Sequence, residues 1–126
     1  MDVVVDHSDP PAPVVMRVVG EVDIYTSAML RQELSVLMSS RQGDLIVDLT
    51  DVDFFDSTGL GVLIRAARQV HDRGSQMALV IHRSRVVDLK MTALGQTFRV
   101  HRTLAEARAS LTGRGPDGPP QPAGSS

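Results

Sequence analysis

The stretch that decides the fold is LIVDLTDVDFFDSTGLGVLIRAARQVHDRGSQMALVI, residues 45–81. Its two ends, 45–49 and 77–81, are nearly continuous apolar runs of the length of a strand. From Ser57 to Gly74, large apolar side chains recur at intervals of three and four, which is the spacing of a helix with one buried face. Strand, helix and strand in this order predict a βαβ unit, in which parallel strands are covered by helices.

The residues before this unit add two strands and one helix to the prediction. β-branched side chains predict a short strand over 3–5 and a second one over 14–19 that ends at Gly20. Leucines at helical spacing then predict an amphipathic helix from Ser27 to Ser40. Strand and helix therefore alternate from the second strand onward.

The residues after the unit predict three shorter elements and a tail. A helical stretch is expected around 86–91, a short strand over 98–100, and a final helix that opens at the capping box of Thr103 and Glu106 and runs to about Leu111. The last fourteen residues, GRGPDGPPQPAGSS, contain no apolar side chain larger than Pro and cannot offset the entropy of ordering. We expect one domain over 1–111 and a disordered tail over 112–126.

Composition excludes several classes of protein. The chain of 126 residues has no cysteine, which excludes disulfides, thiolate metal sites and thiol catalysis. Its net charge is −2 and its 13 basic residues are dispersed, so charge gives no support to nucleic-acid or membrane binding. Asp2 and Asp6 interrupt the first apolar stretch, which argues against a signal peptide, and no apolar run is long enough to span a bilayer. We expect a cytoplasmic protein.

No enzyme, metal site or cofactor is predicted. The 4 histidines show no metal-ligand spacing, and no serine lies in a Gly-x-Ser-x-Gly turn. The remaining class of function is regulation or binding of another molecule.

Topology points to two turns of the chain as the place for such a role. In a parallel sheet, every turn from a strand into a helix opens at the carboxyl edge, where ligands and partners dock. These turns are Gly20–Asp23 and Thr50–Ser57. If the two strands before them are neighbours, Asp23 and Ser57 face each other across one surface.

The same two turns carry a family resemblance. Residues 48–63, DLTDVDFFDSTGLGVL, resemble the signature of the STAS family, named for sulfate transporters and anti-sigma factor antagonists. Gly20-Glu21-Val22-Asp23 resembles the second hallmark of that family, at the expected distance upstream. The resemblance covers 1–111 and implies a STAS fold: an α/β fold with a small mixed β-sheet, parallel βαβ units and helices packed mainly on one face.

The resemblance also implies a function. In the bacterial antagonist branch, a serine kinase that is also an anti-sigma factor phosphorylates the serine of this motif, and a PP2C-type phosphatase reverses the reaction. The unphosphorylated antagonist binds the kinase and thereby releases a sigma factor. The matching serine is Ser57, so we predict an anti-sigma factor antagonist that phosphorylation of Ser57 switches off. The residues assigned to partner binding or to support of phosphorylation are Glu21, Asp23, Asp56, Thr58, Gly59 and Gly61.

Structural roles remain open for most of these residues. Ser57 directly precedes a helical pattern, where serine is a favoured N-cap, and one serine can both cap and be modified. Asp23 is an equal candidate for the cap of the first helix. Thr58 is a competing phosphate acceptor. Gly59 and Gly61 could cradle a phosphate, although no Lys-Ser/Thr follows them as in nucleotide-binding loops.

Gly61 also belongs to a predicted surface stripe. At about 100° per residue, the stripe of Ser57, Gly61, Arg65, Arg68 and Asp72 lies beside the buried face of its helix. A glycine inside a helix costs up to about 1 kcal/mol relative to alanine. Its presence suggests close approach by another backbone, either that of a partner or that of this domain. The two arginines either contact the partner or only face solvent.

Two other functions remain as alternatives. One is a STAS module that does not switch and acts as a scaffold or as the soluble subunit of a transporter. The other is a nucleotide sensor.

Overall fold

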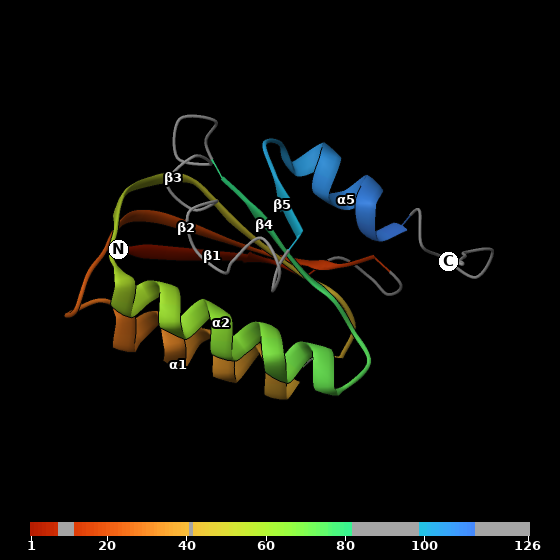
Figure 1. Cartoon of the computed structure of the whole chain (residues 1–126), viewed down its shortest axis with the longest axis horizontal. Helices are drawn as coiled ribbons and strands as arrows, with labels where there is room; N and C mark the ends of the chain where they lie inside the picture. The colour runs from red at the N-terminus through yellow and green to blue at the C-terminus, as the bar shows by residue number, and fades with distance from the viewer. Residues whose placement is uncertain (8–11, 41, 82–98, 113–126) are drawn as a thin grey trace.

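The computed structural model of the chain describes residues 1–7, 12–40, 42–81 and 99–112. Three predicted segments lie outside the described residues: the helix around 86–91, Phe98 of the last strand, and residues 113–126 of the tail. Thr112, which was assigned to the tail, is the last residue of a helix. The described part contains five strands and three helices, which Figure 1 labels. The strands are β1 (Asp2–Asp6), β2 (Val14–Val22), β3 (Leu45–Phe55), β4 (Met77–Val80) and β5 (Arg99–His101), and the helices are α1 (Ser27–Ser40), α2 (Ser57–Asp72) and α5 (Leu104–Thr112).

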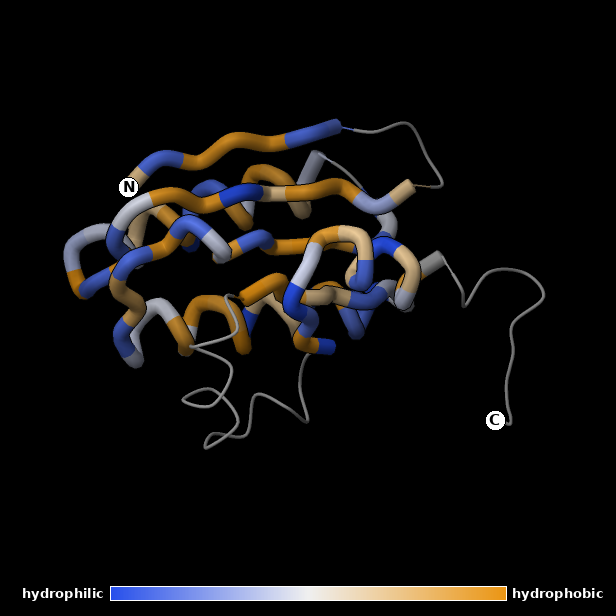
Figure 2. Tube along the Cα trace, turned by 90° about the horizontal axis from the view of Figure 1, so that it is seen from above, coloured by the Kyte–Doolittle hydropathy of each residue, from blue (hydrophilic) through white to orange (hydrophobic). Residues whose placement is uncertain are grey.

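The five strands form one mixed sheet in the order β1-β2-β3-β4-β5. β1 is antiparallel to β2, whereas each of the three following pairs is parallel. The edge strand β1 has an apolar centre between polar ends, Asp2 and Asp6 (Figure 2). Charged ends on an edge strand discourage its pairing with another chain. The predicted α/β fold with parallel βαβ units and a small mixed sheet is confirmed.

Both faces of the sheet are covered. α1 and α2 lie side by side along one face and α5 lies on the other (Figure 1). Because side chains alternate along a strand, consecutive residues of β2 and β3 enter different cores. Val14 and Leu45 pack beneath α1 and α2, whereas Val15 and Ile46 pack beneath α5. Two of the three described helices thus share one face, in agreement with the prediction.

Two strands are longer than the sequence predicts. β2 continues through Gly20 to Val22, and β3 continues past Leu49 to Phe55. Pairing between them persists through two register shifts, at one of which Gly20 takes a φ of 105°, a conformation that favours glycine. The predicted loop over 50–57 is therefore wrong: Asp56 alone lies between β3 and α2.

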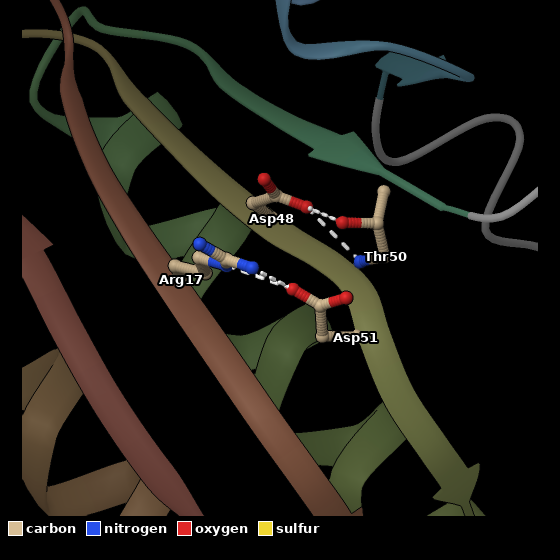
Figure 3. Close-up of polar contacts among 4 residues, drawn as sticks. All are labelled: Arg17, Asp48, Thr50 and Asp51. Atoms are coloured by element: carbon tan, nitrogen blue, oxygen red, sulfur yellow. Dashed lines mark hydrogen bonds and ion pairs between the residues drawn. The ribbon is translucent and has the colours of Figure 1, made fainter.

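Local pairing of polar side chains explains this extension. The Arg17 guanidinium of β2 forms a hydrogen-bonded ion pair with Asp51 of β3 (Figure 3). Asp48, which is buried, accepts hydrogen bonds from the Thr50 amide at 3.0 Å and its hydroxyl at 2.7 Å. These polar groups are satisfied within the sheet. Residues 50–55, whose polar side chains predict a loop, therefore form part of a paired strand.

Candidate functional site

The carboxyl ends of β2 and β3 lie next to each other, as the topology argument predicts. Val22 pairs with Phe55, and one residue later the Asp56 amide donates a hydrogen bond of 3.1 Å to the Val22 carbonyl. Asp23 and Asp56, the residues that follow the two strands, are thus brought together. Their carboxylates are close enough for Asp23 to affect the pKa of Asp56.

Asp56 is the N-cap of α2. Its backbone is extended, with φ −101° and ψ −178°, and its Oδ1 accepts hydrogen bonds from the amides of Thr58 at 3.0 Å and Gly59 at 3.2 Å. A carboxylate satisfies two otherwise unpaired donors in this way and also faces the positive end of the helix dipole. The capping role considered for Ser57 is therefore wrong, because Ser57 is the first residue inside the helix.

The two hydroxyls at the start of α2 differ in their environment. Both side chains are exposed, but the Thr58 hydroxyl donates a hydrogen bond to Asp56 Oδ1. The Ser57 hydroxyl forms no hydrogen bond with any residue in the described part of the chain. Ser57 thus presents an accessible hydroxyl, whereas the competing hydroxyl of Thr58 is engaged.

Asp23 fixes the turn between β2 and α1. Its Oδ1 accepts hydrogen bonds of 2.9 Å from the amides of Tyr25 and Thr26, and its own amide donates to the Thr26 hydroxyl at 2.9 Å. That hydroxyl in turn donates to the Glu21 carbonyl at 2.9 Å. Asp23 therefore fixes the turn before α1 but does not cap the helix itself, because α1 begins four residues later, at Ser27. The side chain of Glu21 is exposed beside this turn.

The hydrogen bonds at both turns stabilise the charged carboxylates. The hydroxyl of Thr58, together with the amides of Gly59 and Thr58, lowers the pKa of Asp56, although partial desolvation and the charge of Asp23 oppose this shift. The amides of Thr26 and Tyr25 lower the pKa of Asp23 in the same way, against partial desolvation. Two ionised carboxylates therefore flank the start of α2 at neutral pH.

The two glycines of the motif have different surroundings. Gly59 is buried, and a Cβ added to it would lie 2.5 Å from Val22 Cγ1 and 3.1 Å from Phe55 Cζ. A Cβ added to Gly61 would meet no atom within 4 Å. The close approach suggested for Gly61 is therefore not made by the described part of this domain. Gly59, considered above for a phosphate cradle, allows the helix to pack against the ends of β2 and β3.

The rest of the predicted stripe on α2 agrees with the structure. Ser57, Arg65, Arg68 and Asp72 are exposed, and Gly61 is half-buried. The stripe runs from the start of α2 along its outer side.

Exposed apolar side chains lie in the same two segments, and sequence analysis missed them. Ile24 is 59% exposed and Tyr25 is 83% exposed in the turn after β2, and Phe54 is 49% exposed at the end of β3. Large exposed side chains beside two adjoining turns are candidates for contact with a partner protein, and tyrosine is enriched among the residues that dominate binding energy. The signal in the sequence was the placement of large apolar residues next to the turn motifs.

The following two statements concern the described part of the chain. It contains no group of three or more His, Asp or Glu side chains that could hold a metal ion. None of its helices is both long and apolar enough to cross a lipid bilayer.

Comparison with known proteins agrees with the fold and the motifs. The family model of the STAS domain matches residues 2–107. The chain therefore belongs to the STAS domain family, and the resemblance seen in its two motifs is confirmed.

Its relatives include named regulators. The chain is 33% identical over 79 residues, which are 63% of its length, to the anti-sigma-B factor antagonist of Bacillus subtilis. It is 27% identical over 118 residues, 87% of this chain and 88% of the relative, to the anti-sigma-F factor antagonist RsfB of Mycobacterium tuberculosis. The matches to the first three relatives span 60% to 72% of their own lengths.

A solved structure shares the fold. The crystal structure of an anti-sigma factor antagonist from Mycobacterium paratuberculosis superimposes with a TM-score of 0.74 at 25% identity, covering 87% of this chain and 92% of that one.

Proposed function

We propose that this protein is an anti-sigma factor antagonist that is switched by phosphorylation of Ser57. The observation that carries the proposal is the accessible, unengaged hydroxyl of Ser57 at the carboxyl edge of the sheet. The names of the relatives support the class of partner. The exposed side chains of Ile24, Tyr25 and Phe54 support protein binding beside this hydroxyl. The role is regulatory binding, not catalysis.

The proposed partner is an anti-sigma factor that is also a serine kinase. Unphosphorylated, the surface around Ser57 binds this partner and thereby releases the sigma factor. Phosphoryl transfer from ATP to the Ser57 hydroxyl ends the interaction, and a PP2C-type phosphatase hydrolyses the phosphoester to restore binding. Asp23 and Asp56 support the switch by holding the two turns in place.

Electrostatics explain how one phosphate would act. It adds about −1.5 to −2 charges at neutral pH. The N-terminus of α2 attracts it, but the ionised carboxylates of Asp23 and Asp56 repel it. Because these local effects oppose each other, we expect no large refolding. Burying a poorly paired dianion against a partner is costly, and a hundredfold loss of affinity requires only about 2.8 kcal/mol.

The proposal is tested by using the unphosphorylated protein as bait in extracts of its source organism. We expect the bait to retain a protein with a kinase fold and to be phosphorylated at Ser57 when ATP is added, with mass spectrometry locating the phosphate. Absence of phosphate at Ser57, both in cells and after addition of ATP, would contradict the switch. It would favour the alternative of a scaffold or transporter subunit that does not switch.

A further inference from the structure

A groove with a volume of about 160 Å³ is lined by residues of α1 and α2. Its apolar floor is formed by Leu34 and Met38 of α1 and by Val62 and Ala66 of α2. The volume matches that of cavities that hold a benzene-sized group. The groove is therefore large enough for one large apolar side chain from outside the domain.

The charged residues that line the groove are all positive. Arg31 of α1 and Arg65 of α2 line it and are exposed, and no acidic residue lines it. In the described part of the chain, neither guanidinium makes a hydrogen bond or an ion pair, whereas Arg17 and Arg73 do. Two unpaired guanidinium groups beside an apolar floor favour a ligand that combines an apolar group with carboxylates.

We propose that this groove docks an acidic amphipathic segment of a partner protein. A large apolar side chain of the segment fills the space above Leu34 and Met38. Carboxylates one helical turn away on either side pair with Arg31 and Arg65. This is the mode in which an amphipathic helix lies in a groove with its apolar side chains as anchors. A complementary charge pattern adds specificity and speeds association.

The groove is a second surface, separate from the edge that carries Ser57. Arg65 follows Ser57 by eight residues, which is about 12 Å along a helix. None of the residues that line the groove belongs to the two turns at the carboxyl edge of the sheet. The proposal therefore goes beyond the anti-sigma function and does not depend on it.

The probe is a helical peptide of about 15 residues with one Phe and with Glu four positions before and after it. A matched peptide carries Gln in place of each Glu. Binding to the full chain is followed by NMR of 13C-labelled methionine methyl groups, since Met38 lines the groove whereas Met16 and Met77 lie in the core. We expect the Met38 signal alone among these three to shift on titration with the acidic peptide. The Gln peptide should bind at least about tenfold more weakly.

Substitutions in and near the groove test which side chains bind the acidic peptide. Arg31→Gln and Arg65→Gln should each weaken binding of the acidic peptide by about threefold to tenfold. Arg68→Gln makes the same charge change on α2 outside the groove and should change the affinity by less than about twofold. Ser35→Trp, at an exposed position that lines the groove, should fill it and abolish the Met38 shift without entering the core. Thermal melts confirm that each variant is folded.

Several results would overturn the proposal. No shift of Met38 at millimolar acidic peptide would show that the groove does not accept such a segment. Equal binding of both peptides, or equal weakening by Arg68→Gln and Arg65→Gln, would show that the two groove arginines give no selectivity. A Met38 signal that shifts on dilution without peptide would identify a second copy of the chain as the occupant instead.

Discussion

Val22 and Phe55 are paired residues at the last positions of β2 and β3, and the Asp56 amide extends this pairing by donating to the Val22 carbonyl at 3.1 Å. The sheet therefore remains hydrogen-bonded up to the residue before α2. As a consequence, the position of Ser57 is set by the sheet and not by a loop. A change that separates the start of α2 from these strand ends will displace the phosphate acceptor.

We expect Gly59→Ala to destabilise the protein. The new Cβ would lie 2.5 Å from Val22 Cγ1, and a buried β-branched side chain cannot easily move away. Overpacking of this kind costs about 1–3 kcal/mol. Gly61→Ala is the matched control, because its Cβ meets no atom and a helical Gly→Ala change stabilises by up to about 1 kcal/mol. Urea unfolding of both variants measures the difference, and equal stability would contradict the packing role of Gly59.

Gly61→Leu should weaken binding to the anti-sigma partner while the fold stays intact. Gly61 lies one helical turn after Ser57, and the space beside it is open, so a leucine side chain would project toward a partner that covers Ser57. We expect a loss of affinity of at least about tenfold by calorimetry, equivalent to about 1.4 kcal/mol. Unchanged affinity would place Gly61 outside the interface.

Acid should destabilise the protein through Asp23 and Asp56. The pKa of each carboxyl is lower in the folded protein than its usual value of 3.8. A lowered folded pKa stabilises the fold above the unfolded pKa of about 3.9, and this contribution is lost as the pH falls through the folded pKa. Free energies of unfolding measured between pH 6 and pH 2 should therefore fall more steeply for the wild type than for Asp56→Asn, which keeps a capping oxygen. Parallel curves would show that Asp56 makes no such contribution.

The sequence was sufficient to predict most elements of the fold. The range of α1, Ser27–Ser40, matches the prediction. The reason is that its leucines recur at helical spacing and form the buried face of the helix. The capping box predicted for α5 is half formed: the Glu106 amide donates to the Thr103 hydroxyl at 3.1 Å, but the Glu106 carboxylate accepts from the Arg102 amide at 3.4 Å and not from that of Thr103. By contrast, the second half of β3 was predicted as a loop. Its polar side chains are paired with β2 and with one another, and such pairing leaves no trace in a pattern of hydropathy.

The candidate site was predicted in its location but not in its internal roles. Neighbouring parallel strands bring Asp23 and Asp56 together, as topology requires. Whether Asp56 or Ser57 is the N-cap depends on which of two adjacent positions begins the helix. Helix propensities do not predict the first residue of a helix with that accuracy. The role of Gly59 depends on the position of Val22, which is distant in the sequence and becomes its neighbour only in the folded sheet.

Two substitutions at Ser57 should separate a switch from a structural role. Ser57→Ala removes the accessible hydroxyl but leaves the cap in place, because Asp56 provides it. We expect a change in stability within about 0.5 kcal/mol, as for other surface substitutions. The variant should bind the kinase and resist inactivation by ATP.

Ser57→Asp should behave in the opposite way in binding. Its carboxylate lies at the N-terminus of α2, where the helix dipole favours it and the nearby Asp56 opposes it, so the variant should fold like the wild type. The same charge lies at the surface that the partner must contact, and the affinity for the partner should fall by at least about tenfold.

ATP-dependent phosphorylation, binding affinity and thermal melts are measured together for both Ser57 variants, with Thr58→Val as the control for the second hydroxyl. If Ser57→Ala incorporates as much phosphate as the wild type and Thr58→Val incorporates none, Thr58 is the acceptor and the assignment of Ser57 is wrong. If Ser57→Asp binds as tightly as the wild type, a negative charge at this position does not control the interaction.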